Sequence, residues 1–331
     1  MRFPEFSGEW ENTELQYIAP NICSGKDKPT SNGTVALYGS TGIIGMTRLA
    51  SYNEEIVLVA RVGANAGQLQ ITTIPCGVTD NTLIINAKEW NRYIYYYLQH
   101  YNLNRLVFGS GQPLITGSML KKLKIIYGEE SERNKIVNLL CLLDERIATQ
   151  NKIIDKLQSL IKGIAQNITC SNKPNVHISE CLECSSSTLQ ESDVCENGAY
   201  PVYGANGVVG YLNYYNTLSE AIYIIKDGSG VGTVSYVTGK CSPTGTLNIL
   251  QVKDGYSLRY LYYLLKVFNF EPYKTGMAIP HIYFKDYGKA KIFCPQYSEQ
   301  LKYATLLFTI DDKLSTEQEI LKSLNLEKQY L

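Results

Sequence analysis

The sequence of 331 residues lacks any long apolar run, since no stretch approaches the roughly 18 residues of a membrane-spanning helix. Its opening, MRFPEFSGEW, has neither an apolar centre nor a small-residue cleavage site, so it does not read as a secretory signal. We therefore expect a cytoplasmic protein without membrane contact. Net charge is also lacking, because 31 Lys and Arg balance 31 Asp and Glu. That balance argues against a general nucleic-acid coat, which is usually basic, but allows local basic surfaces.

Signatures of catalysis are also missing. The chain has only three histidines, and none lies near a nucleophile in a known motif. It contains no G-x-S-x-G, no H-E-x-x-H, no Walker loop and no N-P-P-Y of methyltransferases. We therefore predict a binding protein with no catalytic residues and no cofactor.

Nine cysteines are present, and a reducing cytosol keeps such residues as thiols. Four of them, Cys170, Cys181, Cys184 and Cys195, form a cluster with one C-x-x-C pair, so a zinc site is one interpretation. The first half of the chain has no matching cysteines, and the outer spacings fit no zinc pattern. We therefore predict mostly buried thiols and no metal.

What the chain does have is internal repetition. The phrase YGSTGIIG at 38–45 returns as YGANGVVG at 203–210, which is 165 residues later. Four further pairs of similar segments follow in the same order: 54–67 with 219–232, 82–86 with 246–250, 93–102 with 260–269, and 109–125 with 276–292. Five ordered matches predict a duplicated unit. Each copy combines short β-type runs with one amphipathic Tyr-rich helix, which indicates a mixed α+β globule.

The repeated glycine phrase is open to two interpretations. A glycine-rich loop can bind phosphate, but G-x-x-G-x-x-G is not the dinucleotide spacing, and the second copy is followed by the strand-like YLNYY. We therefore interpret these glycines as tight turns between strands, where another backbone or a ligand can approach closely.

Each half ends in a long segment with a heptad pattern. Residues 129–166 contain no proline and one glycine, and their apolar residues recur at alternating steps of four and three. The C-terminal segment repeats this stripe 167 residues later, with Glu317 where Gln150 stood. Each long helix packs either on its own globule or, as the length of the pattern favours, on the other helix as an antiparallel coiled coil. The predicted seam residues are Ile136, Leu140, Leu143, Ile147, Gln150, Ile154, Leu157, Leu307, Ile310, Leu314, Glu317, Leu321 and Leu324.

Together these patterns predict an α+β protein with two repeated globules and two spacer helices. We expect the globules at 1–128 and 168–295, and the helices at 129–167 and 296–331. A polar layer of Gln150 and Glu317 within the seam would reduce stability but fix the register of the helices.

The pattern resembles the specificity subunit of type I restriction-modification systems. The resemblance rests on YPVYGANGVVGY (200–211), AIYIIKDGSGVGTV (221–234), TGMAIPHI (275–282) and the helix entry from Pro295 to Gln300. The opening RFPEFSGEW also resembles the start of target-recognition segments in this family. Resemblance extends over nearly the whole chain. The first copy departs from it, because its helix entry reads EESER without proline and its loop reads SGQPLIT in place of TGMAIPHI.

The resemblance implies a mechanism. Each globule would be a target-recognition domain that reads one half of a split site in double-stranded DNA, and the helix pair would set the unread gap. Methyltransferase subunits would dock along the helices and modify an adenine flipped out of each half-site. Motor-nuclease subunits would cleave unmodified DNA. The chain itself would be non-catalytic.

Candidate DNA contacts lie on the glycine-rich turns and neighbouring loops, because base readout requires polar side chains on exposed turns. Matched positions differ as two domains reading different sequences require: Arg61 corresponds to Lys226, and Asn65 to Gly230. For each candidate, ordinary solvation is an equal alternative, and the apolar run before His281 favours a structural role for it. The predicted DNA-binding residues are Arg61, Asn65, Ser110, Gln112, Lys226, Asp227, Ser229, Lys274, Thr275 and His281.

Two other classes of function stay open. One is a structural scaffold that bridges two proteins without DNA, and the other is a nucleotide-binding transferase that uses the glycine-rich turns. Binding of the chain to duplex DNA in the presence of a methyltransferase would favour a DNA-binding adaptor over the scaffold. Turnover by the isolated chain would favour the second.

Overall fold

The computed structural model describes residues 2–72, 75–109, 111 and 113–330. The chain divides into two units: unit 1 comprises Met1–Thr149 and Lys322–Leu331, and unit 2 comprises Gln150–Leu321. Two long helices, α4 (Glu130–Cys170) and α8 (Tyr297–Tyr330), each contribute to both units. Each unit therefore consists of one globule and the adjoining parts of two helices.

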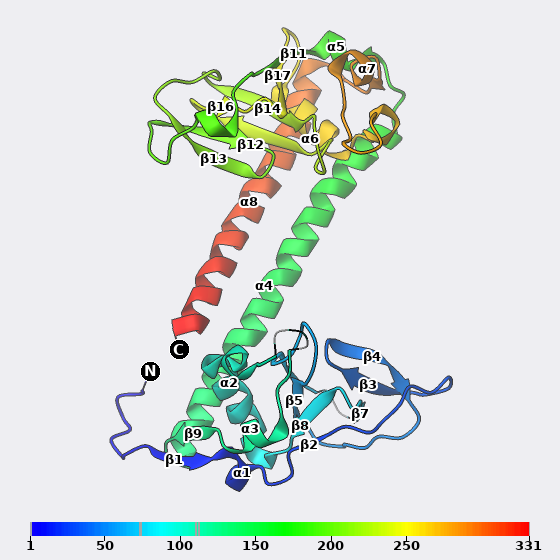
Figure 1. Cartoon of the computed structure of the whole chain (residues 1–331). Coiled ribbons are helices and arrows are strands. Elements are labelled where there is room, and N and C mark those ends of the chain that lie inside the picture. Colours follow the sequence, from blue (N-terminus) through cyan, green and yellow to red (C-terminus); the bar gives the residue numbers. More distant parts are fainter. Residues whose placement is uncertain (1, 73–74, 110, 112, 331) are drawn as a thin grey trace. The chain divides into compact units, whose positions relative to one another are not determined.

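The described strands of unit 1 form three sheets (Figure 1). A four-stranded sheet has the order β2-β8-β5-β6, a three-stranded sheet has the order β4-β3-β7, and β1 pairs with β9. The strands are β1 (Glu11–Glu14), β2 (Cys23–Ser24), β3 (Val35–Gly39), β4 (Gly42–Thr47), β5 (Val57–Ala60), β6 (Leu69–Ile71), β7 (Cys76–Val78), β8 (Thr82–Ile85) and β9 (Lys124–Tyr127). The shorter helices are α1 (Leu15–Ile18), α2 (Asn91–Tyr101) and α3 (Gly117–Lys121), with 3-10 turns at Lys88–Trp90 and Leu103–Leu106.

Strand β5 of unit 1 is buried on both faces. Successive side chains of a strand point to opposite sides. Val57 and Val59 therefore join the core that includes α2, whereas Leu58 joins a second core with residues of β3 and β7. Burial on both faces explains why this strand is a continuous apolar run and not an alternating pattern.

Unit 2 repeats this topology strand for strand, with sheets β11-β17-β14-β15, β13-β12-β16 and β10-β18. Hairpin β12–β13 has a register shift between Val202 and Tyr203, and hairpin β3–β4 has one between Leu37 and Tyr38. The predicted duplicated α+β fold is therefore confirmed. The strands are β10 (Val176–His177), β11 (Leu182–Ser186), β12 (Tyr200–Gly204), β13 (Gly207–Leu212), β14 (Glu220–Ile225), β15 (Val234–Thr238), β16 (Ser242–Pro243), β17 (Leu247–Val252) and β18 (Lys291–Ile292). The shorter helices are α5 (Ile178–Cys181), α6 (Leu258–Val267) and α7 (Phe284–Tyr287), with 3-10 turns at Glu191–Asp193 and Glu271–Tyr273.

The repeated glycine phrase forms the two β-hairpins β3–β4 and β12–β13. Gly39 pairs with Gly42 across the first turn, and Gly204 pairs with Gly207 across the second. The second glycine of each pair has a positive φ, 115° at Gly42 and 100° at Gly207, which residues with a side chain rarely adopt. The phrase is therefore a strand–turn–strand element, as interpreted from the sequence.

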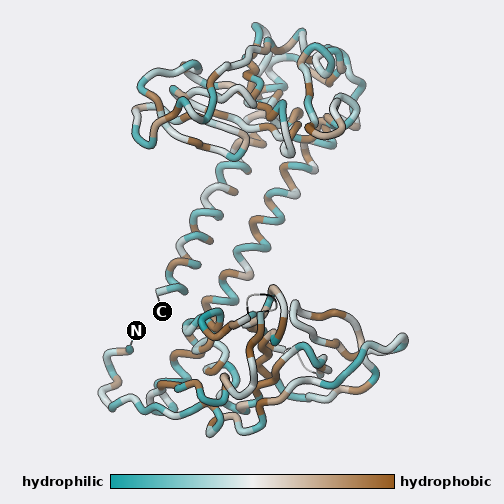
Figure 2. Tube along the Cα trace, in the orientation of Figure 1, coloured by the Kyte–Doolittle hydropathy of each residue, from teal (hydrophilic) through white to brown (hydrophobic). Residues whose placement is uncertain are grey.

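In unit 2, α4 and α8 lie side by side and antiparallel (Figure 1). The side-chain amide of Gln150 donates to the main-chain carbonyl oxygen of Glu317 at 2.9 Å and also to its carboxylate. Ile154 and Leu314 belong to the same buried core. Apolar and polar residues alternate along both helices (Figure 2), as an apolar stripe requires. The predicted packing of the two helices on each other is confirmed.

Helix α8 also packs on the globule of unit 2, which is the other arrangement that the sequence allowed. Tyr263 of α6 donates from its hydroxyl to Asp311 Oδ2 at 3.1 Å. Gln300, which is 1% exposed, accepts from the main-chain N–H of Ser257 at the start of α6. Among the helices that the structure describes, none is long and apolar enough to cross a membrane.

Candidate nucleic-acid interface

Two loops of unit 2 are joined along their backbones. Loop A2, residues 226–232, follows strand β14, and loop B2, residues 274–282, precedes α7. The N–H of Gly228 donates to the carbonyl oxygen of Pro280 at 3.0 Å, and the N–H of Ile282 donates to that of Lys226 at 2.9 Å. Asp227 and His281 thus form an antiparallel bridge. We call this pair of loops the unit 2 platform.

Unit 1 contains an equivalent platform. Its loop A1, residues 61–67, follows β5, and its loop B1 lies within 108–115. The N–H of Gly63 donates to the carbonyl oxygen of Pro113 at 2.9 Å, and the N–H of Ile115 donates to that of Arg61, also at 2.9 Å. The same bonds recur in both halves at the matched positions of the repeat, so the two platforms share one backbone frame.

Loop B2 is closed on itself at its base. Thr275 and His281 exchange both main-chain hydrogen bonds, at 2.9 and 2.8 Å. Gly276 has φ 88°, and a Cβ atom there would lie 2.3 Å from the carbonyl oxygen of Ile279. The loop therefore requires glycine at this position, and it presents the side chains beyond it to solvent.

The platform of unit 2 brings together all six residues predicted there for DNA contact. His281 Nδ1 lies 2.6 Å from Asp227 Oδ1, and the imidazole stacks on Tyr283 with ring centroids 6.5 Å apart. Lys274 donates to Glu271 at 2.6 Å, while Thr275 is exposed. Lys226 and Ser229 complete the set on loop A2, where Ser229 is exposed and Lys226 is half-buried.

In unit 1, two predicted residues can be placed. Arg61 is half-buried and its main-chain N–H donates to the carbonyl oxygen of Asn81 at 2.9 Å. Asn65 lies at the exposed turn of loop A1. Ser110 and Gln112 fall outside the described residues.

The structure also places residues at the platforms that the sequence analysis did not select. Loop A1 lines a cavity of about 410 Å³ together with Asn102 and Asn104, which follow helix α2. The tip of loop B2 carries Met277 and Ile279, which are 107% and 58% exposed. The available signal was position, since Asn102 ends the repeated segment 93–102 and both apolar residues lie within the repeated segment 276–292. Apolar and helix-end residues do not match the polar pattern expected for base readout.

The predicted seam residues are all buried or half-buried. Those in unit 2 lie where α4 and α8 pack on each other, whereas Ile136 packs against the core of the unit 1 globule. Gln150 and Glu317 are each 7% exposed, and Lys313 forms an ion pair with Glu317 one helical turn away. The buried seam residues are Gln150, Ile154, Leu307, Leu314, Glu317 and Leu324, and the half-buried ones are Ile136, Leu140, Leu143, Ile147, Leu157, Ile310 and Leu321.

The polar layer of the seam predicts an acid-dependent stability. Hydrogen bonds from Lys313 and then from Gln150 hold the pKa of the Glu317 carboxyl below its usual value. A lowered folded-state pKa contributes stability at neutral pH that is lost as the pH falls through that lowered value. We expect the Tm of the native chain to exceed that of Glu317→Gln at pH 7, and the difference to shrink below about pH 4.5. Thermal melts across this pH range measure it.

The matched control for this prediction is Glu319→Gln, an exposed carboxylate two residues further along α8. Its difference from the native chain should be small and should vary little across the same pH range. An equal pH response in both variants would contradict a role for the Gln150–Glu317 layer.

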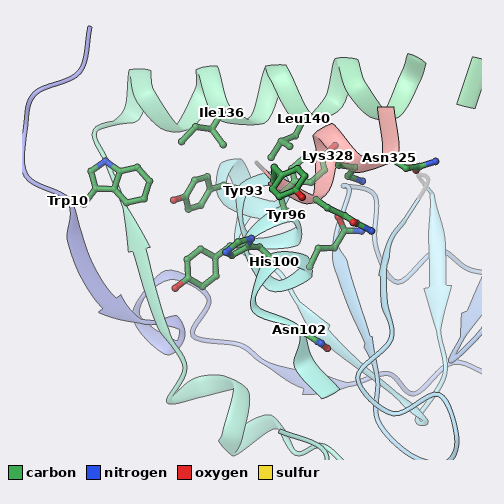
Figure 3. Close-up of a pocket in the computed structure, with 13 residues that line it drawn as sticks. Trp10, Tyr93, Tyr96, His100, Asn102, Ile136, Leu140, Asn325 and Lys328 are labelled. Atoms are coloured by element: carbon green, nitrogen blue, oxygen red, sulfur yellow. The ribbon is translucent and has the colours of Figure 1, made fainter. Parts of the chain in front are cut away.

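A cavity of about 750 Å³ in unit 1 lies between α2, α4 and the end of α8 (Figure 3). Tyr96 and Lys328 both contact Asp144: the Tyr96 hydroxyl donates to Oδ2 at 2.9 Å, and the Lys328 ammonium donates to Oδ1. Burial raises the pKa of the Tyr96 hydroxyl, which keeps its proton for this bond. None of the eight described residues predicted for DNA contact lines this cavity. Asn102 lines both this cavity and the smaller cavity at loop A1, so the two adjoin at the end of α2.

The side chains at the start of α4 have different partners from those at the start of α8. Glu132 is fully buried, where it accepts from Arg2 and from the indole N–H of Trp10. The guanidinium of Arg133 lies 3.5 Å from the ring centre of Trp90. At the matched positions of the repeat, Gln300 instead bonds to the backbone at Ser257. Arg133, which corresponds to Gln300 in the repeat, thus contacts an aromatic ring where Gln300 bonds to the backbone.

The clustered cysteines are spread over several elements of unit 2. Cys181 is buried and its sulfur lies 3.9 Å from that of Cys294, whereas Cys170 and Cys195 are exposed. Cys184 is half-buried in β11. Across residues 2–72, 75–109, 111 and 113–330, no group of three or more His, Cys, Asp or Glu is arranged to hold a metal ion.

Comparison with known proteins gives a family match over nearly the whole chain. The model of the type I restriction modification DNA specificity domain matches residues 2–159 and again 175–326. The EcoprrI type I restriction enzyme specificity subunit of Escherichia coli is 24% identical over 125 residues, which are 38% of this chain and 31% of that protein. A putative type I specificity subunit of Mycoplasma pneumoniae, S.MpnORF285P, is 27% identical over 130 residues, or 37% of this chain and 42% of that protein. The matched segments thus span less than half of these relatives.

Solved structures share the fold at low sequence identity. The type I restriction-modification S subunit from M. genitalium superposes with a TM-score of 0.75 at 18% identity, covering 97% of this chain and 94% of that one. A chain from a study of complex assembly and conformational transition of the type I R-M system gives a TM-score of 0.53 at 15% identity, covering 100% and 97%. With its two matched copies of the domain, the chain belongs to the type I restriction modification DNA specificity domain family.

Proposed function

We propose that this chain is the DNA-specificity subunit of a type I restriction-modification complex, and that each globule reads one half of a bipartite site in double-stranded DNA. The observation that carries the proposal is the platform, which occurs once in each unit with the same backbone bonds and different side chains. A protein that reads two different half-sites needs a common loop backbone that can carry different base-contacting side chains. Membership of the specificity domain family supports the same proposal.

The proposed partners follow from this role. Methyltransferase subunits dock along α4 and α8 and modify an adenine in each half-site, which must leave the base stack to reach an active site. Motor-nuclease subunits complete a complex that cleaves unmodified DNA. In this assembly the chain selects the sequence and carries out no chemistry. Its balanced charge fits partners that supply much of the phosphate contact.

The long helices have a distinct part in the proposal. Two globules recognise a split site only if the distance between them is fixed. Each base pair added to the gap shifts the second half-site along the DNA axis and also rotates it about that axis. A helix pair with a buried seam resists stretching and sliding. The Gln150–Glu317 bonds favour a single register, since a shift along the seam would bury these polar groups against apolar ones.

The proposal is tested by mapping methylated adenines in the genome of the host strain with the gene intact, deleted and restored. We expect one bipartite methylated motif to disappear on deletion and to return on restoration. An unchanged set of motifs would contradict the proposed role. Purified chain that joins two proteins but has no effect on methylation would favour a scaffold instead.

A further inference from the structure

The two platforms carry different pairs of side chains at one equivalent place. Val62 bridges Leu114 in unit 1, and Asp227 bridges His281 in unit 2. Each bridge is flanked by the same two main-chain hydrogen bonds, so the four residues occupy matching positions. One platform thus presents an apolar pair where the other presents a carboxylate and an imidazole.

The backbone of the platform does not depend on the charged pair. The same bridge forms with valine and leucine, whose side chains make no hydrogen bonds. Asp227 and His281 also keep 37% and 35% of their side-chain surface exposed, so they do not compensate each other inside a core. A purely structural role is therefore a poor explanation of this pair.

The geometry of the pair prepares the imidazole for an external ligand. Nδ1 lies 2.6 Å from Asp227 Oδ1, so the Nδ1–H tautomer of the imidazole donates a hydrogen bond to the carboxylate, and this bond favours that tautomer. The ring of Tyr283 lies beside the imidazole, with the two centroids 6.5 Å apart and the rings inclined by 26°. In that tautomer the imidazole presents the lone pair of Nε2, which can accept a hydrogen bond from an amino group.

We propose that the Asp227–His281 pair reads one base of the half-site of unit 2, with His281 Nε2 accepting from the amino group of adenine or cytosine in the major groove. This inference rests on the proposed function. Adenine N6 and cytosine N4 are the amino donors on that edge of DNA. The equivalent Val62–Leu114 pair can make only apolar contacts, such as with the methyl group of thymine. The two half-sites are thus expected to differ at the base that faces this position.

The test replaces the pair of unit 2 by that of unit 1, in Asp227→Val/His281→Leu. The variant and the native chain, each assembled with the methyltransferase subunits, select binding sites from duplexes with randomised half-sites. We expect preference at one position of one half-site to fall by about tenfold to a hundredfold, with the other half-site unchanged. Asp254→Val, which removes an exposed carboxylate between β17 and α6, is the control and should leave selection unchanged.

A second variant guards against loss of folding. His281→Gln keeps hydrogen-bonding groups on loop B2 and should remain selective while changing the base preferred at that one position. Weaker binding to every sequence with the same preferences, or unchanged selection in both variants, would overturn the inference. If the native complex selects no bipartite site, the proposed function itself fails, which is a different result from a lost preference at one position.

Discussion

One base pair inserted between the two half-sites is expected to weaken specific binding of the assembled complex by about 10³-fold. Each added base pair moves the second half-site by about 3.4 Å and turns it by about 34° around the DNA axis. Helices held by a buried seam do not lengthen to follow. One platform would then no longer face the bases of its half-site. The complex would keep the base contacts of one half-site and its non-specific phosphate contacts.

The measurement is a competition titration with duplexes whose gap is native, one base pair longer or one base pair shorter. The control duplex carries its extra base pair outside the two half-sites and should bind as the native one does. Equal affinity for all three gap lengths would show that the connection between the two globules is flexible. The proposal that the helices set the distance between the half-sites would then be wrong. Because salt sets the phosphate contribution, all titrations share one ionic strength.

Substitution of Leu307 by alanine is expected to lower the stability of unit 2 by about 2–5 kcal/mol. Leu307 is fully buried in the core that combines both long helices with the globule. Removing its side chain leaves a cavity in a region that is already close-packed, and the surrounding helices can close it only in part. Leu306, the adjacent residue, is 50% exposed, so Leu306→Ala should change stability by less than about 1 kcal/mol.

Hydrogen exchange of main-chain amides measures this effect locally. We expect faster exchange in β14 and α6 of unit 2 for Leu307→Ala, with β5 of unit 1 as the internal reference. Chemical denaturation followed by circular dichroism gives the accompanying change in stability. Similar behaviour of the two alanine variants would mean that Leu307 is not at the centre of the packed core.

The fold was largely predictable because its main signals are local and repeated. Strand β14 and strand β5 are apolar runs at matching positions, and the heptad steps predicted which helix residues are buried. Comparison within the chain supplied a second copy of the five repeated segments and of the heptad stripe. A weak strand signal in one half was supported by its counterpart in the other.

The contacts of the site were less predictable, because they join residues far apart in the sequence. Asp227 and His281 were each selected as exposed polar residues, yet their hydrogen bond spans 54 positions. Glu132 bonds to Arg2 across 130 positions. Hydrophobic periodicity reports which face of an element is buried and carries no information about which polar partner meets which. For this reason the platforms, as paired loops, emerged only from the three-dimensional structure.

The main-chain bonding of each platform has an evolutionary consequence. Since carbonyl and amide groups hold the paired loops, mutations that exchange the outward side chains incur little folding cost. In the proposed role, a side-chain change on one platform alters one half of the recognised site, while the duplicate platform leaves the other half unchanged.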